Sequence, residues 1–377
     1  MRIGPDGERQ FPCAQCGAWL RFDPGAEQLK CDYCGHLNPI AAAGPAVAEQ
    51  DFAAAIAATR DQQEMETLDT ARCQSCAAEF TLDPKLDSGA CPFCGSAVVR
   101  EIRRAEQLKP RGVLPFKITS ADAGERFRTW LKGLWFAPGK LKQYARADGT
   151  GLAGMYTPYW TFDSSTTSSY TGERGDDYTT YETRTVTRNG KTTTERVPVT
   201  RTRWTPVSGT VSRNFDDVLV LASNSLPAAI TDRLEPWDLG NMKPFADEYL
   251  SGFRTERYQV DLTEGFARGR AKMDAVIRGD VRRDIGGNHQ RIHSVNTQHS
   301  GVTYKHVLLP IWLAAYQYQS KTYRFVVNGR TGEVQGERPW SWLKIAGAVA
   351  AAIVIAGAIY AVVQLGGGGN GGVPGLK

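Results

Sequence analysis

The 377-residue sequence has no cysteine outside four CxxC pairs, only five histidines and a single long apolar run. From Met1 to Gln10 the chain is polar, so no secretory signal is predicted. A phosphate-binding loop is also lacking. Gly190-Lys191-Thr192 has Thr185 where that motif needs its first glycine, and it overlaps a hairpin-turn signal. Because nucleophile elbows and paired catalytic acids are missing too, we predict that the chain is not an enzyme.

The histidines carry no metal-binding motif. His289 and His293 are four residues apart, and His299 and His306 follow them. This spacing can bind a metal ion on a helix, but the stretch has the pattern of a strand. It also has no HExxH motif and no neighbouring pair of carboxylates, so we predict no metal site there.

The eight cysteines form two copies of one pattern, in which fourteen residues separate two CxxC pairs. The second copy begins 60 residues after the first, and Leu20 recurs as Phe80 in the repeated spacer. Two such pairs offer four thiolates to one tetrahedral ion. We therefore predict two zinc ribbons, each with one structural zinc ion, and the ligands Cys13, Cys16, Cys31, Cys34, Cys73, Cys76, Cys91 and Cys94.

Two other uses of these cysteines are disfavoured. Disulfides are typical of secreted domains, and nothing else in the sequence indicates secretion. A thioredoxin-like redox pair needs a surrounding βαβ unit, which no CxxC pair has. Gly17, Gly35 and Gly95 follow the second cysteine of their pairs, and Ala77 takes this place once. Glycine there tolerates the positive φ that a metal-binding turn often requires.

The net charge of +5 is unevenly distributed. Residues 1–99 contain 7 Lys and Arg against 14 Asp and Glu, a net of −7. Two zinc ions with four thiolates each would bring this segment to about −11. Residues 100–150 contain 12 basic against 5 acidic residues, a net of +7. The ribbons are therefore acidic, which disfavours contact with nucleic acid, whose binding depends on Lys and Arg near phosphates.

The long apolar run extends from Ile345 to Leu365 without a charged residue. As a helix it would span roughly 31 Å, which matches the hydrocarbon core of a bilayer. Trp340 and Trp342 precede it where interfacial aromatic residues lie, and Arg338 and Lys344 flank the same side. We predict a single transmembrane helix in the cytoplasmic (inner) membrane. The basic flank places the N-terminus and the bulk of the chain in the cytosol.

The middle of the chain alternates helical and strand patterns. A helix is expected from Ser120 to about Phe136, with Trp130 on its apolar stripe and basic residues beside it. Such a helix either packs on a sheet or lies on an anionic membrane. A second helix should begin at Asp261, with Glu264 in a capping box, and run to about Ile285. Strands are expected at residues 113–116, 291–299, 304–318 and 323–327, and a weak repeat of Thr157-Pro158-Tyr159-Trp160 at Leu309 suggests two related halves.

Asn189-Gly190 is a strong hairpin-turn signal between residues 178–188 and 191–204. Thr, Arg and Glu occupy both faces of this hairpin, so neither face can be buried, and we expect it to project from the domain. Pro198 suits only an edge strand. Its edges could add to the sheet of a partner, or the hairpin could be a solvated insertion.

These features give six segments in order: ribbon 1 at residues 1–40, an Ala-rich helical spacer at 41–70, ribbon 2 at 71–100, an α+β cytosolic domain at 101–340, a transmembrane helix with its interfacial flank at 341–365, and a Gly-rich tail at 366–377. The predicted fold class is α+β. It comprises two small zinc ribbons, a mostly antiparallel middle domain with a long projecting hairpin, and one C-terminal transmembrane helix.

The two ribbons are followed by Leu114-Pro115-Phe116-Lys117, the run from Trp130 to Pro138, Tyr159-Trp160, the run from Ser169 to Gly172, Leu309-Pro310-Ile311-Trp312 and the run from Tyr323 to Gly332. Over nearly the whole chain, this combination resembles bacterial tail-anchored membrane proteins with zinc ribbons of the kind found in transcription factor TFIIB. Proteins of this family are often labelled as a primosomal helicase, replication factor Y, although no NTPase motif is present here. The resemblance implies zinc binding, membrane attachment and association with membrane scaffolds of the SPFH (flotillin-like) class or with phage-shock-type stress systems. It supplies no catalytic residues.

We therefore expect a non-enzymatic adaptor that is held on the membrane by the helix from Ile345 to Leu365 and docks a protein partner through its ribbons. The alternative is a membrane-tethered nucleic-acid-binding protein, which the acidic charge of the ribbons disfavours.

Overall fold

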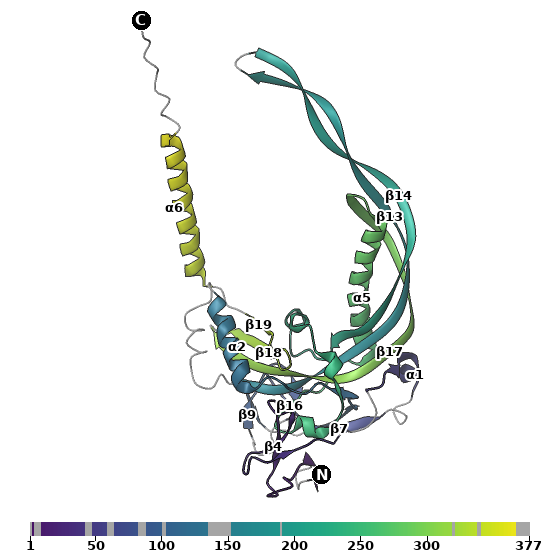
Figure 1. The fold of residues 1–377 in the computed structure, drawn as a ribbon, viewed down its shortest axis with the longest axis vertical. Coiled ribbons are helices and arrows are strands. Elements are labelled where there is room, and N and C mark those ends of the chain that lie inside the picture. The colour runs from purple at the N-terminus through teal and green to yellow at the C-terminus, as the bar shows by residue number, and fades with distance from the viewer. Residues whose placement is uncertain are drawn as a thin grey trace.

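The computed structural model describes residues 2–3, 9–41, 47–58, 64–81, 88–99, 103–134, 152–188, 191–318, 321–337 and 341–366. The small sheets of the two ribbons lie at the base of a large curved sheet, and a separate helix extends from the same body (Figure 1). The predicted fold class is confirmed. The chain has two N-terminal cysteine clusters, a mixed body dominated by strands, and one C-terminal helix long and apolar enough to span a membrane.

Three long antiparallel strands form the large sheet: β13 (Ala153–Arg188), β14 (Lys191–Leu221) and β17 (His289–Tyr318). β17 pairs with β13 from Leu313 opposite Ala153 to His289 opposite Gly175. Beyond Gly175, β13 and β14 continue as a two-stranded arm (Figure 1). This is the projecting hairpin that the sequence predicts, and its turn at Asn189-Gly190 lies outside the described residues.

The long strands differ from the shorter ones expected from the sequence. β13 and β14 extend inward beyond residues 178–204, because their inner halves supply core residues such as Trp160 and Val220. The strands expected at 291–299 and 304–318 are one continuous β17, with Gly301 at positive φ between them. Period-two patterns cannot show whether such an interruption ends a strand.

Short strands complete the nine-stranded sheet, which is mostly antiparallel with two short parallel pairs, β12 with β17 and β13 with β16. Of the strand expected at residues 113–116, only Val113 lies in a strand, which begins one residue earlier at Gly112. These strands are β6 (Gln50–Asp51), β12 (Gly112–Val113), β15 (Lys243–Pro244), β16 (Arg254–Thr255), β18 (Lys321–Asn328) and β19 (Val334–Gly336).

Helix α5 (Leu262–Ile285) lies along the inner side of the curved strands (Figure 1). It begins as predicted, with the Asp261 carboxylate accepting the Glu264 N–H at 2.8 Å. Gly265 lets the helix approach the sheet, because a Cβ there would lie 2.6 Å from Trp160 Cδ1. The buried stripe of this helix is Leu262, Met273, Ile277, Val281 and Ile285, and its five arginines lie off that stripe: Arg268, Arg270, Arg278, Arg282 and Arg283.

Helix α2 (Ser120–Gly133) is a core helix. Thr119, one residue before the expected Ser120, caps it, because the Thr119 hydroxyl accepts the Asp122 N–H. Phe127 is fully buried and its ring lies 4.9 Å from that of Phe325 on β18, while Trp130 packs 5.6 Å from the same ring. The packing alternative therefore holds for residues 120–133. The expected end near Phe136 lies outside the described residues.

The described part of the body also contains short helices: α1 (Phe52–Ala57), α4 (Ala228–Thr231), η2 (Asp232–Leu234), η3 (Leu239–Asn241) and η4 (Asp247–Leu250). The prediction of a helical spacer at 41–70 is wrong in its second half. Helix is confined to α1 among the described residues there, and β7 begins at Met65. Residues 65–70 of this strand pair with residues 103–108, a distant contact that the local Ala-rich composition could not show. Nor does α1 stand between the ribbons, because Phe52 packs 4.5 Å from Phe266 of α5.

Ribbon 1 contains a three-stranded sheet of β3 (Leu20–Asp23), β4 (Gln28–Cys31) and β5 (Leu37–Asn38) beside a strand pair. The strand pair of ribbon 1 is β1 (Arg2–Ile3) with β2 (Arg9–Gln10). In ribbon 2, β9 (Ser88–Ala90) pairs with β10 (Ala97–Val99). Beside them, β7 (Met65–Arg72) pairs with both β8 (Glu79–Phe80) and β11 (Arg103–Leu108).

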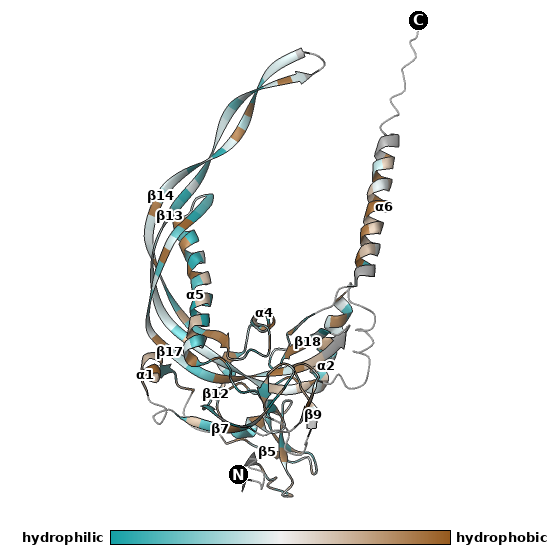
Figure 2. Cartoon of the chain, turned by 180° about the vertical axis from the view of Figure 1, so that it is seen from behind, coloured by the Kyte–Doolittle hydropathy of each residue, from teal (hydrophilic) through white to brown (hydrophobic). Residues whose placement is uncertain are grey.

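Helix α6 (Trp342–Gly366) stands apart from the body, and hydrophobic residues recur around it (Figure 2). Lys344–Val362 has a mean hydropathy of 2.4 and is 0% buried. A soluble protein would cover such a surface, so its exposure is consistent with a helix that can cross a membrane. Trp340 and Arg338, which were expected to flank the helix, lie outside the described residues, as does the tail after Gly366.

Candidate metal centres

Each ribbon gathers its four cysteine Sγ atoms within 4.8 Å of one another. In ribbon 1 the Sγ atoms of Cys13 and Cys34 are 3.7 Å apart, and those of Cys16 and Cys31 are 3.5 Å apart. These separations exceed the roughly 2.05 Å of a disulfide. A tetrahedron with Zn–S bonds of about 2.3 Å has edges of about 3.8 Å. The donor set of ribbon 1 therefore fits a tetrahedral metal ion.

Ribbon 2 repeats this geometry. The Sγ atoms of Cys73 and Cys94 are 3.5 Å apart, and those of Cys76 and Cys91 are 3.7 Å apart. Four thiolate ligands complete the coordination of a tetrahedral ion and leave no position for substrate, as is typical of structural sites. All eight cysteines that the sequence selected are thus brought together as two groups of four.

The four metal-binding turns share one backbone conformation. The residue after each second cysteine has positive φ: 74° at Gly17, 73° at Gly35, 73° at Gly95 and 59° at Ala77. In each turn its N–H donates to the carbonyl of the first cysteine, as from Ala77 to Cys73 at 2.9 Å. Left-handed backbone is costly for a residue with a Cβ. The second ribbon therefore stores local strain at the one turn that lacks glycine.

Two neighbouring thiols of ribbon 2, Cys76 and Cys91, have pKa values that shift in opposite directions. The Cys91 thiol beside Cys76 lowers the pKa of Cys76 to about 5, despite its partial burial. The same contact raises the pKa of Cys91, and burial raises it further. A divalent cation that binds all four sulfurs as thiolates would release the protons held by this cluster.

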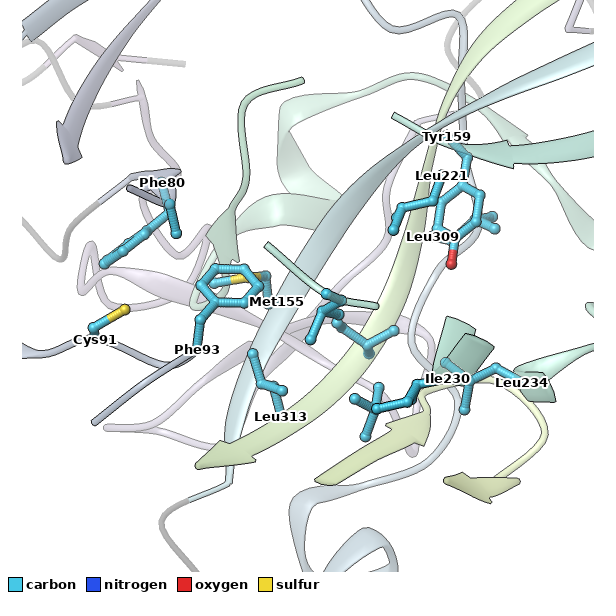
Figure 3. Close-up of a cluster of buried hydrophobic side chains, with 14 of the residues drawn as sticks. Phe80, Cys91, Phe93, Met155, Tyr159, Leu221, Ile230, Leu234, Leu309 and Leu313 are labelled. Atoms are coloured by element: carbon cyan, nitrogen blue, oxygen red, sulfur yellow. The ribbon is translucent and has the colours of Figure 1, made fainter. Parts of the chain in front are cut away.

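The second CxxC turn of each ribbon, its second knuckle, has an aromatic residue between its two cysteines. The burial of this residue differs between the two ribbons. In ribbon 2 this residue is Phe93, which is fully buried in a cluster with Met155, Leu313 and Phe80 (Figure 3). Its carbonyl oxygen accepts a hydrogen bond from Arg324 Nε at 2.9 Å. The metal-binding turn of ribbon 2 is therefore part of the core of the body.

The equivalent residue of ribbon 1, 60 positions earlier, is Tyr33, and 86% of it is exposed. Trp19 and Leu37 of the same ribbon are 45% and 43% exposed. Ribbon 1 contacts the body through other residues, such as Phe22, whose N–H donates to the Ser251 carbonyl at 3.0 Å. Within the described part of the chain, Tyr33 is left accessible to another molecule. The repeat aligns a tyrosine with a phenylalanine here, but this alignment does not show which of the two is buried, since Tyr156 and Tyr159 are buried elsewhere in the chain.

Ribbon 2 also borders a buried acid that the sequence did not single out. Glu256 is fully buried, accepts a hydrogen bond from the Ser223 hydroxyl at 2.5 Å, and forms a β-bridge with Phe80. Burial raises its pKa to about 7. Among the described residues its Oε2 has no hydrogen-bond partner, and an unpaired buried oxygen costs less free energy in the neutral carboxyl group than in the carboxylate.

The histidines of β17 lie on a strand, as the sequence predicts. His289 Nε2 is 3.0 Å from Asp177, and His293 Nε2 is 3.8 Å from Glu173. Across the described parts of the chain, no histidine belongs to a group of three or more metal ligands. A third such group, Glu49 with Asp163 and Asp216, consists of carboxylates alone, and Lys305 pairs with Glu49 at 3.4 Å. We assign no metal to it.

No family model matches the chain, and no solved structure matches it. The chain is similar to an uncharacterized protein of Bacillus subtilis strain 168, named YdjG. The two are 27% identical over 351 residues, which cover 89% of this chain and 92% of YdjG. The similarity therefore extends over most of both chains.

Proposed function

We propose that this protein is a non-enzymatic adaptor, attached to the cytoplasmic membrane by α6, that recruits a protein partner through ribbon 1. The two metal ions are zinc in this proposal, because four thiolates form the preferred donor set of a structural zinc site. Closed coordination gives them a folding role and no chemical role.

The observation that carries the proposal is the exposed knuckle of ribbon 1. A tyrosine with 86% of its surface in solvent lies between two candidate metal ligands, in a ribbon that also exposes Trp19 and Leu37. Tyr and Trp are enriched among residues that dominate protein interfaces. The same position in ribbon 2 carries a buried phenylalanine, so exposure at this position is not a requirement of the ribbon fold.

Charge supports a protein partner over nucleic acid. Residues 1–99 carry a net charge of −7, and two zinc–thiolate centres make this segment more negative still. A polyanion such as DNA would be repelled by this surface. By the family resemblance, the partner is a membrane scaffold of the SPFH class or a component of an envelope-stress system.

Membrane attachment rests on α6. Its 19-residue apolar span is uncovered by the body, and the basic residues near it lie on the N-terminal side. The positive-inside rule then orients ribbons and sheet toward the cytosol.

The proposal is tested by capturing the full-length chain from detergent-solubilised membranes. We expect a stoichiometric protein partner with the wild type and its loss with Tyr33→Ala. The matched control is Tyr181→Ala on the hairpin, another exposed tyrosine, which should retain the partner. Capture of no partner, equal capture with Tyr33→Ala, or salt-dependent capture of nucleic acid would each contradict the proposal.

A further inference from the structure

The outer part of β13 has a free backbone edge. Its last pairing with β17 is at Gly175, and the described residues include no strand beside it from 176 to 188. The Asp177 N–H points to this edge, since it donates to the Asn288 side chain at 3.0 Å. Because the register with β14 is continuous here, N–H groups alternate between the two sides. The N–H groups of Thr179, Tyr181, Thr183, Thr185 and Thr187 therefore face outward.

The opposite edge of the hairpin is interrupted. Pro198 pairs with Tyr181, one of the outward-facing residues, so its ring nitrogen also lies on the outer edge of β14. Pro206 lies an even number of residues from Pro198, so its nitrogen faces the same edge and a second N–H donor is missing there. Proline on an edge strand prevents pairing with other chains. On the β13 edge, none of the five residues whose N–H groups face outward is a proline.

The free edge is self-complementary. A two-fold axis at Thr183 would place an identical strand antiparallel to it, with each outward-facing residue opposite another outward-facing one. In this register Glu182 of each copy faces Arg184 of the other, and Thr180 faces Val186. Glu182 and Arg184 are both exposed. Axes at Glu182 or Arg184 would instead place like charges opposite each other, which is destabilising.

We propose that two copies of this chain associate through the outer edge of β13, residues 179–187, forming a four-stranded antiparallel sheet from two hairpins. The pairing would form about ten backbone hydrogen bonds and two Glu182–Arg184 pairs. Glu182 already contacts Arg201 of its own chain at 2.5 Å, yet half of its side chain remains accessible to the second copy. This inference does not depend on the adaptor proposal, which concerns ribbon 1.

The test is sedimentation equilibrium of the full-length chain in detergent micelles. We expect a monomer–dimer equilibrium that Thr183→Pro weakens roughly tenfold or more, because two backbone donors at the centre are lost. The matched control, Thr200→Pro, places a proline on the outer edge of β14, beside the existing Pro198, and should leave the dimer unchanged. A wild type that stays monomeric at micromolar concentrations, or equal effects of the two prolines, would overturn the proposal.

A charge exchange tests the register without altering the backbone. Glu182→Lys alone and Arg184→Glu alone each create two like-charge pairs across the axis, so each variant should associate more weakly than the wild type. Mixed together, the two variants can form a heterodimer in which every facing pair attracts. Stronger association in the mixture than in either variant supports the register. A mixture no stronger than its components would overturn it.

Discussion

Phe93 and Tyr33 occupy equivalent positions of the repeat, yet truncating them should have very different effects on the free energy of unfolding. Phe93 is fully buried, whereas Tyr33 is 86% exposed. Truncating a buried phenylalanine to alanine costs about 3–5 kcal/mol, through lost transfer free energy and the cavity left behind. Truncating an exposed residue usually changes stability by less than about 0.5 kcal/mol. Phe93→Ala should therefore remove a large share of the stability of the body, and Tyr33→Ala almost none.

Urea unfolding of the full-length chain in detergent, followed by tryptophan fluorescence with excess zinc, measures both variants. Metal analysis provides the control, because both variants retain all eight cysteines and should bind two metal ions. A cost below about 1 kcal/mol for Phe93→Ala would refute the burial of the ribbon 2 turn. A cost above about 2 kcal/mol for Tyr33→Ala would refute the free knuckle of ribbon 1.

Three further predictions concern the metal centres and the buried acid. Ala77→Gly should stabilise the chain by about 1 kcal/mol, because Ala77 is exposed at φ 59° and has no packing to lose; the urea midpoint should rise. Cys34→Ser should lower the zinc content from two ions to one per chain by mass spectrometry, and a value that stays at two would exclude Cys34 as a ligand. Glu256 keeps its proton in the folded state up to a pKa of about 7, whereas the unfolded group loses it near 4.5. The contribution of the protonated group to the free energy of unfolding is therefore lost as pH rises from 4.5 to 7, by at most about 3 kcal/mol. Glu256→Gln should remove this pH dependence of stability, and a variant with the same pH dependence as the wild type would contradict the raised pKa.

Several features could be predicted because their signals are local. Cysteine spacing selected all eight residues of the two clusters, since a CxxC turn is fixed by a few consecutive residues. The capping box at Asp261 located the start of α5 to the residue. The uncharged run from Ile345 identified α6, whose length and hydropathy depend on no distant contact.

Other features depend on contacts between distant residues. Met65–Arg72 is a strand because it pairs with residues 103–108, although the preceding segment is rich in alanine. The different burial of Phe93 and Tyr33 depends on where each ribbon meets the body, which spacing cannot show. The free edge of β13 similarly follows from the point at which β17 ends, at Gly175.

The central claim is that ribbon 1 presents its knuckle to a protein partner. The most direct measurement places a photoreactive residue there, as Tyr33→benzoylphenylalanine, and irradiates intact membranes. Because Tyr33 is 86% exposed, the larger ring can be accommodated without disturbing the metal cluster. We expect one discrete cross-link from position 33 to a different protein, whereas the same residue at Tyr181 should cross-link to no protein other than a second copy of this chain. Cross-linking of position 33 to nucleic acid, or no product with a different protein above the Tyr181 control, would contradict the claim.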